Sequence, residues 1–300
     1  MIADTLWSQS LGVRKQALVY LPPDYDRDPS RRFAVAYYLH GLWGNETDWV
    51  KLGRLDAAMD SLIAAGGQEM IVIMPDGDDG WYTTWNSLGD WRGCLAHPPA
   101  KEPAASYCVP WPHYDDYIAR DLVAHVDATF RTRAQPAHRA IAGLSMGGLG
   151  AVALALAYPD VFSAAASHSG VLSPLYQGPH PFAGTPVYAS DEGALRAGWG
   201  ERFWPLMVPV FGRDTAGWWA RDPSRLARRL KESRVGQMPA LFLDVGRDDG
   251  LADESRAFHA SLTALGLPHA YAEWPGKHDW VYWRTHVGES LAWLAERIAR

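Results

Sequence analysis

Two hydrophobic patterns alternate along the chain: short apolar runs typical of buried strands, and longer stretches with helical spacing. Strands are predicted at Gln16–Leu21, Phe33–Leu39, Met70–Met74, Arg139–Ala142, Val161–Ser167, Leu241–Val245 and Ala270–Trp274. Helices are predicted at Lys51–Ala65, Tyr117–Phe130, Met146–Tyr158, Glu254–Leu265 and Val281–Ala299. Strands that alternate with helices in this way indicate an α/β fold with a mostly parallel central sheet flanked by helices.

Two long stretches interrupt the alternation, at Gly77–Pro112 and Leu172–Met238. Loops of more than about 15 residues are usually functional or disordered, and the aromatic content of these two indicates order. We therefore expect one domain over residues 1–300, in which 77–112 and 172–238 are insertions around a site.

Composition limits the classes of partner. Hydrophobic residues make up 48% of the 300 positions, charged residues 21%, and the formal net charge is −6. This balance favours a well-packed core and disfavours nucleic acid, which needs a basic surface. No apolar run approaches the roughly 20 residues that span a membrane. The first residues, MIADTLWSQSLG, lack the pattern of a signal peptide, and composition leaves the compartment and the oligomeric state open.

The sequence shows no cofactor or metal motif: Cys and His residues do not group at zinc spacing, and phosphate-binding glycine loops and acidic calcium loops are missing. The two cysteines, Cys94 and Cys108, share one loop rich in Pro and Trp. Two cysteines are too few for a disulfide framework. They permit a single bridge, and the sequence leaves open whether it forms.

A candidate nucleophile lies between the predicted strand Arg139–Ala142 and the predicted helix Met146–Tyr158. The residues Gly143-Leu144-Ser145-Met146-Gly147 fit the pattern G-x-S-x-G. A strand, a sharp turn and a helix are the context in which this motif exposes a nucleophilic serine. The flanking residues must be small because the turn is tight, and the helix N-terminus stabilises negative charge next to Ser145.

Two backbone N–H groups are candidates for an oxyanion hole. One is that of Met146, directly after the nucleophile, and the other is that of Leu42, in the loop His40-Gly41-Leu42 that follows the strand Phe33–Leu39. Such donors stabilise the negative charge of a tetrahedral intermediate. We interpret His40 as a residue that holds this loop rather than as a catalytic group.

The base and its acid should follow the serine in chain order, the acid first. His278 follows the last strand in the loop Trp274–Trp280, from which it can reach back to Ser145. The strand Leu241–Val245 leads to Gly246-Arg247-Asp248-Asp249-Gly250, so the acid is Asp248 or Asp249. Asp244 lies within the strand and is interpreted as structural.

With these residues placed, the chain resembles the esterase D family of α/β-hydrolases, which includes S-formylglutathione hydrolases, feruloyl and acetyl-xylan esterases, and mycolyltransferases. The resemblance covers nearly the whole chain. It rests on the motifs YLPPDYD at Tyr20–Asp26, YLHGLWGNETDW at Tyr38–Trp49, MPDG at Met74–Gly77, AGLSMGG at Ala142–Gly148, ASHSG at Ala166–Gly170 and GKHDWVYW at Gly276–Trp283.

The resemblance implies an α/β-hydrolase fold, a Ser145–Asp249–His278 triad and no cofactor. Asp249 is favoured over Asp248 because the acid of the family usually lies three residues after the glycine that ends its strand. The expected partner is a small ester with a short or aromatic acyl group, attached to an alcohol or sugar. The segment Trp81–Pro112 with its two cysteines departs from the family and leaves the substrate open.

Four tryptophans are candidate substrate-binding residues, because pockets tend to be lined with aromatic side chains: Trp43, Trp81, Trp85 and Trp280. The alternative for the loop that carries Trp81 and Trp85 is a purely structural role in packing. Two other functions stay open: thioester hydrolysis or acyl transfer on the same triad, and carbohydrate binding without catalysis.

Overall fold

The computed structural model describes residues 1–98, 100, 102–233 and 236–299. Its centre is an eight-stranded sheet with the order β1-β2-β4-β3-β5-β6-β9-β10. These strands are β1 (Ile2–Ser8), β2 (Val13–Tyr20), β3 (Ala34–Leu39), β4 (Met70–Pro75), β5 (Arg139–Leu144), β6 (Ala164–His168), β9 (Ala240–Gly246) and β10 (Ala270–Trp274). All pairs from β4 to β10 are parallel, whereas β1 and β2 join in antiparallel fashion. The predicted α/β-hydrolase fold, with a mostly parallel sheet, is confirmed.

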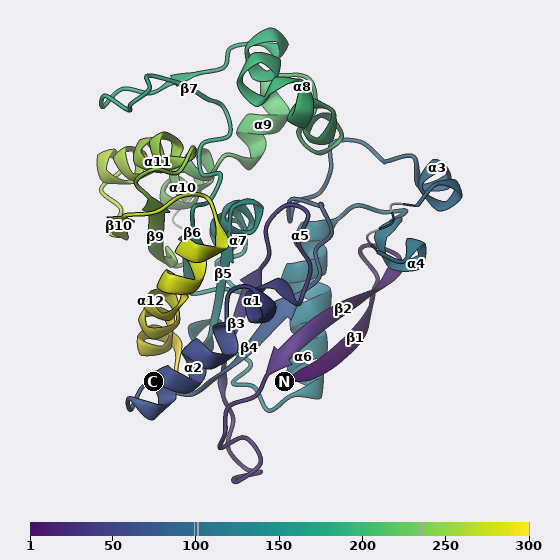
Figure 1. Cartoon of the computed structure of the whole chain (residues 1–300), viewed down its shortest axis with the longest axis vertical. Coiled ribbons are helices and arrows are strands. Elements are labelled where there is room, and N and C mark those ends of the chain that lie inside the picture. Colours follow the sequence, from purple (N-terminus) through teal and green to yellow (C-terminus); the bar gives the residue numbers. More distant parts are fainter. Residues whose placement is uncertain (99, 101, 234–235, 300) are drawn as a thin grey trace.

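Helices cover both faces of this sheet (Figure 1). The helices are α1 (Asp48–Lys51), α2 (Leu55–Ala64), α3 (Trp91–Ala96), α4 (Ala104–Tyr107), α5 (Tyr114–Asp116), the π-helix η1 (Tyr117–Leu122), α6 (Val123–Thr129), the 3₁₀ turn η2 (Pro136–His138), α7 (Met146–Ala157), α8 (Glu192–Phe211), α9 (Thr215–Arg221), α10 (Pro223–Ser233), α11 (Ala252–Ala264) and α12 (Trp280–Ile298). None of the described helices is long and apolar enough to span a membrane.

The alternation of side chains along β3 shows how the two faces are filled. Val35, Tyr37 and Leu39 join the core with η1, α6 and α7, whereas Ala36 and Tyr38 join the core with α2 and α12. Successive residues of a strand point to opposite faces, and both faces of β3 are buried. A near-continuous apolar strand is therefore required here, as is usual in parallel sheets.

The parallel strands all end at the same edge of the sheet, and the two long insertions gather there. Residues 172–238 contribute the two-stranded ribbon β7 (Tyr176–Gly178) and β8 (Val187–Tyr188) together with α8, α9 and α10. In Figure 1, α8 and α9 lie beyond the upper end of the sheet, and α3 and α4 from the other insertion project to its side. Ligand sites of open α/β sheets lie at the carboxyl ends of strands.

Within the central sheet, the structure adds one strand that the sequence pattern did not predict. β1 pairs with β2 through the turn that ends at Gly12. Most residues of β1 are exposed because the strand lies at the edge of the sheet. An edge strand of this kind lacks the continuous apolar run by which the inner strands are recognised.

Candidate active site

Ser145 lies in a strained turn between β5 and α7. Its backbone angles are φ 53° and ψ −117°, a conformation that residues other than glycine rarely adopt. A Cβ on Gly143 would lie 2.3 Å from the Gly147 carbonyl oxygen, and a Cβ on Gly147 would lie 2.5 Å from the carbonyl oxygens of both Leu39 and His40. These contacts involve backbone atoms that cannot move aside, so both positions of the motif require glycine.

A chain of hydrogen bonds joins Ser145 to His278 and Asp249. The Ser145 Oγ lies 2.9 Å from His278 Nε2, and His278 Nδ1 lies 2.9 and 3.1 Å from the two oxygens of Asp249. With Nδ1–H donated to the carboxylate, Nε2 is free to accept the hydroxyl proton of Ser145. The carboxylate of Asp249 is fully buried, whereas the imidazole of His278 is about a third exposed.

The other aspartates near this chain have different partners. Asp248 is exposed, and its backbone N–H donates to Gly276. Asp279 accepts the N–H of Tyr282 and caps the N-terminus of α12. Asp244 lies 2.7 Å from His168 Nδ1, and it also accepts a hydrogen bond from the Tyr282 hydroxyl at 2.8 Å. Asp249, not Asp248, is therefore the aspartate whose carboxylate contacts the His278 imidazole.

The loop after β3 lies directly beside Ser145 and carries Leu42. A Cβ on Gly41 would lie 3.5 Å from that of Ser145. His40 holds the loop through two hydrogen bonds: its Nδ1 to the Gly41 carbonyl oxygen at 2.8 Å, and its Nε2 from the Gly77 N–H at 2.9 Å. Trp43 has a positive φ of 64°, and its N–H donates to the carboxylate of Asp79 at 2.6 Å. Met146 begins α7 directly after Ser145.

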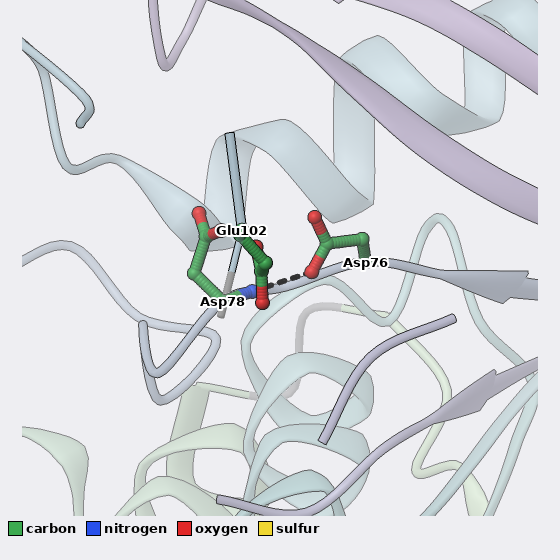
Figure 2. A group of neighbouring side chains, drawn as sticks. All are labelled: Asp76, Asp78 and Glu102. Atoms are coloured by element: carbon green, nitrogen blue, oxygen red, sulfur yellow. Dashed lines mark hydrogen bonds between the residues drawn. The ribbon is translucent and has the colours of Figure 1, made fainter. Parts of the chain in front are cut away.

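Three acidic side chains form a cluster at the end of β4, on the same edge of the sheet. Figure 2 shows Asp76, Asp78 and Glu102 side by side, each with a carboxylate oxygen within 4.8 Å of the others. The Lys15 ammonium lies 2.6 Å from both Asp76 and Asp78. Burial opposes its charge, but the two carboxylates outweigh burial and raise the pKa of Lys15.

The pKa values of the two carboxyl groups that contact Lys15 are shifted in opposite directions. Burial disfavours the charged form of both. For Asp76, the nearby imidazole of His40 and the charge of Lys15 outweigh burial and hold its pKa well below the usual value. For Asp78, burial prevails and raises its pKa well above the usual value. The cluster thus already contains its own cation and connects β2 to the loop after β4.

A cavity of about 600 Å³ opens in front of Ser145 and His278. Its lining includes six aromatic side chains, those of Trp43, Trp81, Trp199, Phe203, Trp280 and Trp283. It also includes the polar side chains of Gln177, His180 and Glu254. A cavity of this size and lining suits a small organic ligand that has both apolar and polar parts.

The structure separates the four tryptophans selected from the sequence. Trp43, Trp81 and Trp280 line the cavity with Ser145. Trp85 instead stacks on Tyr114, donates its indole N–H to the Gly80 carbonyl oxygen at 3.1 Å, and lines a separate cavity of about 160 Å³. That smaller cavity also contains Cys94 and Cys108, which form a disulfide. The structure thus places Trp85 outside the cavity in front of Ser145, because its contacts turn it toward the disulfide loop.

Sequence reasoning missed the part of the cavity wall that comes from residues 172–238 and from α11. Trp199 and Phe203 lie on α8, and Glu254 lies in the first turn of α11. The long insertion was expected near the site, but its pattern gave no reason to choose individual residues. The paired aromatic residues of GWGERF at residues 198–203 were the available signal.

Comparisons with known proteins identify the family of the chain. The family model "Esterase", described as "Putative esterase", matches residues 8–294. The chain is 25% identical to an acetyl esterase of Caldicellulosiruptor saccharolyticus over 302 aligned residues, which cover 97% of this chain and 96% of that protein. It is 32% identical to an endo-1,4-beta-xylanase/feruloyl esterase of Xylanibacter ruminicola over 53% of this chain and 20% of that protein.

Among solved structures, a ferulic acid esterase superposes with a TM-score of 0.71 and 25% identity, over 98% of this chain and 97% of that one. The family match spans all of the elements that carry Ser145, Asp249 and His278. This chain therefore belongs to the esterase family of α/β-hydrolases and is a carboxylic-ester hydrolase.

Proposed function

We propose that the enzyme is a serine esterase that works through a covalent acyl-enzyme, with Ser145 as nucleophile, His278 as general base and Asp249 as the acid that orients the base. The observation that carries the proposal is the continuous hydrogen-bonded chain from Ser145 Oγ through His278 to the buried carboxylate of Asp249. Nucleophile, base and orienting acid within hydrogen-bond reach are the signature of an activated serine.

In the first half of the reaction, Ser145 Oγ attacks the ester carbonyl carbon while His278 Nε2 takes the hydroxyl proton. The tetrahedral intermediate then collapses, the bond to the alcohol breaks, and His278 returns the proton to the leaving alcohol. In the second half, His278 takes a proton from water, the hydroxide attacks the acyl-enzyme, and Ser145 regains its proton as the acid leaves.

The backbone N–H groups of Leu42 and Met146 are proposed to bind the oxyanion. Met146 is the first residue of α7, so its N–H is among those that the helix leaves without an internal partner. The helix N-terminus also favours negative charge at this point. The hydrogen bonds of His40 and Asp79 fix the loop that carries Leu42 before substrate arrives, which is the preorganisation that such a site requires.

The aromatic wall of the cavity favours esters with a short or aromatic acyl group, including acylated sugars, as in the acetyl and feruloyl esterases to which the chain is similar. Trp43, Trp81 and Trp280 are proposed to contact the substrate. Thioester hydrolysis or acyl transfer would use the same triad. Added acceptor alcohol separates hydrolysis from transfer, because a transferase forms new ester in place of free acid.

Covalent labelling of Ser145 tests the proposal directly. The wild-type enzyme should react with a fluorophosphonate probe and hydrolyse p-nitrophenyl acetate. Ser145→Ala should lose the label and several orders of magnitude of kcat without loss of thermal stability, because the triad acts as a unit. If Ser145→Ala keeps more than a tenth of the activity, the nucleophile is another residue. A wild-type protein that binds sugars but takes up no label would instead be a binder.

A further inference from the structure

His40 holds the loop that carries Leu42, and both of its ring nitrogens face backbone groups. The residue is buried, its Nδ1 lies 2.8 Å from the Gly41 carbonyl oxygen, and its Nε2 lies 2.9 Å from the Gly77 nitrogen. A carbonyl oxygen only accepts hydrogen bonds, whereas a backbone N–H only donates them. Nδ1 therefore carries a proton and Nε2 carries none, so His40 is the neutral Nδ1–H tautomer.

A second proton on His40 would break this arrangement, because the N–H groups of Nε2 and of Gly77 would then face each other. Gly77 has no room to retreat on the side of Tyr82, since a Cβ on Gly77 would lie 2.2 Å from that ring. The Tyr82 hydroxyl also donates to the His40 carbonyl oxygen at 3.2 Å. The imidazole would therefore have to turn, which would break its bond to Gly41 and move the N–H of Leu42.

Asp76 is the neighbour that favours the second proton. Its carboxylate lies 3.7 Å from His40 Nε2, and both side chains are buried. A negative charge at this distance stabilises a protonated imidazole. The ammonium group of Lys15 opposes this effect from β2, where it is fully buried and lies 2.6 Å from both Asp76 and Asp78. Neutral His40 gives Asp76 no proton, so Lys15 is the group that balances the charge of Asp76.

Other ionisable groups near His40 and Asp76 come from the same loop, α1, the loop after β4, α5, η1 and the disulfide insertion. They are Glu46, Asp48, Asp78, Tyr82, Glu102, Tyr114 and Tyr117. Burial raises the pKa of Glu46, of Asp78 and of the tyrosines, which favours their uncharged forms. Asp48 lies toward Nδ1, because a Cβ on Gly44 would lie 2.5 Å from its carboxylate and 3.0 Å from His40 Nδ1. Asp48 therefore favours the proton that the neutral tautomer already carries.

We propose that Lys15 is a positioning residue of the esterase, which balances the charge of Asp76 and thereby keeps His40 neutral. The neutral imidazole in turn keeps the N–H of Leu42 in place for the oxyanion. This inference rests on the proposed esterase function and deepens it. Without Lys15, His40 would take up the second proton in the neutral pH range and pair with Asp76. The loss of an interaction made only in the transition state lowers kcat and kcat/KM equally, so the effect should appear in kcat and not in KM.

Profiles of kcat against pH for the wild type and Lys15→Met test this proposal, with p-nitrophenyl acetate as substrate. Methionine keeps an unbranched side chain but removes the charge. At pH 6.5, Lys15→Met should lose between about tenfold and 10²-fold in kcat, up to the value of one oxyanion donor, with little change in KM. At pH 9 the imidazole loses its second proton, so kcat should return to within about threefold of the wild type. Lys51→Met, at an exposed lysine of α1, is the control and should keep the wild-type profile.

Two double variants distinguish an effect through His40 from a general loss of structure or charge. Lys15→Met/Asp76→Asn also removes the charge that attracts the second proton, so it should recover most of kcat at pH 6.5. Lys15→Met/His40→Gln carries an amide, which both donates and accepts hydrogen bonds but takes up no proton. Compared with His40→Gln alone, it should show no further pH-dependent loss. If the loss in Lys15→Met is the same at all pH values, or if neither double variant reduces it, the proposal is overturned.

Nitrogen NMR of the enzyme with isotopically labelled histidine gives a readout that does not depend on activity. The signals of His40, assigned with His40→Gln, should show a proton on Nδ1 alone between pH 6.5 and pH 9 in the wild type. In Lys15→Met, both ring nitrogens should be protonated at pH 6.5. Protons on both nitrogens of His40 in the wild type at pH 7 would overturn the proposal.

If Lys15→Met fails to fold, Lys15→Met/Asp76→Asn decides the matter. This double variant should fold, keep the wild-type tautomer of His40 and keep kcat at pH 6.5, because the charge that Lys15 balances is gone. Its failure to do so would overturn the proposal. Failure of the esterase function is distinguishable, since it appears as absence of fluorophosphonate labelling in the wild type.

Discussion

Ser145 is held in its unfavourable backbone conformation by the residues around it, not by its own preference. The turn is compressed between β3 and α7, so that Gly147 lies against the carbonyl groups of Leu39 and His40. The same compression brings the loop of Leu42 beside the nucleophile. The strain at Ser145 and the position of the proposed oxyanion hole thus have one cause, the close approach of two backbone segments.

Gly147→Ala should therefore damage both stability and catalysis. The added methyl group meets backbone oxygens at 2.5 Å, so the strand and the helix must separate and carry Leu42 away from Ser145. We expect a large loss of kcat on p-nitrophenyl acetate and a lower Tm. Gly288→Ala is the matched control, because its Cβ meets nothing within 4 Å inside α12. It should raise stability by about 0.5–1 kcal/mol and leave kcat unchanged. Equal effects of the two changes would contradict this account.

Two adjacent aspartates allow a test of the acid at single-residue resolution. Asp249→Asn keeps the shape of the side chain but places His278 in the wrong tautomer, which should cost about 10³–10⁴ in kcat. Asp248 is exposed and only its backbone contacts Gly276, so Asp248→Asn should stay within about twofold. Steady-state kinetics on one ester suffice for the comparison. The reverse ranking would transfer the role to Asp248.

At the scale of elements, the inner strands and the nucleophile turn could be predicted because their signals are local. Six consecutive buried positions mark β3 and β4 as central strands, and G-x-S-x-G between β5 and α7 marks the turn. The order of Ser145, Asp249 and His278 along the chain follows from the topology of the fold. The extent of the domain over residues 1–300 stays a prediction.

The cavity wall could not be predicted in the same way because it depends on contacts between distant segments. Trp81 and Trp85 are four residues apart in one loop, yet only Trp81 turns toward Trp199 and Phe211 and so joins the substrate cavity. Trp85 is drawn to Tyr114 and Gly80 on the other side. Composition indicated an aromatic site, but the direction of each ring is decided by partners outside the loop.

The insertion that carries α3 and α4 is stabilised by the Cys94–Cys108 disulfide, which closes a short loop with a sequence separation of 14. Replacing both cysteines with serine should lower the free energy of unfolding by about 3 kcal/mol, the entropy value for a loop of this length. Neither cysteine lines the substrate cavity, so kcat on p-nitrophenyl acetate should remain within about twofold.

Thermal and urea unfolding with and without reductant measure the disulfide effect. The wild-type protein in reductant should lose as much stability as the double serine variant, and the variant should not respond to reductant. A reduced wild-type protein with unchanged unfolding would show that the loop is held by its packing alone. A selective loss of activity on aromatic esters would instead show that the disulfide loop acts on the substrate cavity.

At the scale of the whole molecule, the buried carboxyl groups make stability depend on pH. Asp222 is fully buried just before α10, where its carboxyl accepts the N–H of Arg225. Burial raises the pKa of Asp222 to about 7. In the unfolded chain the group ionises near its ordinary value of 3.8, so the folded state holds this proton up to a higher pH than the unfolded state does.

The sign of the effect follows from this difference. Below the unfolded pKa both states are protonated and the contribution of Asp222 is fully present. As pH rises toward the folded pKa, the unfolded state gains by ionising and stability falls, by on the order of 4 kcal/mol in total. Asp222→Asn removes the titration and keeps an acceptor for the N–H of Arg225. The free energy of unfolding of the wild type minus that of the variant should therefore decline steadily between pH 4 and pH 7 and level off above pH 7.

Urea unfolding of both proteins across this range gives the difference directly. Asp248→Asn, at an exposed carboxyl, is the control and should show no such trend. Burial likewise raises the pKa of Glu254, to about 8, which is about one unit above that of Asp222. Asp222→Asn and Glu254→Gln should therefore change the free energy of unfolding in adjacent pH ranges. In the double variant, the free energy of unfolding should depend less on pH over both ranges. Asp222 does not line the substrate cavity, so Asp222→Asn should leave ester selectivity unchanged. A pH-independent difference for Asp222→Asn would mean that this carboxyl is ionised in the folded protein.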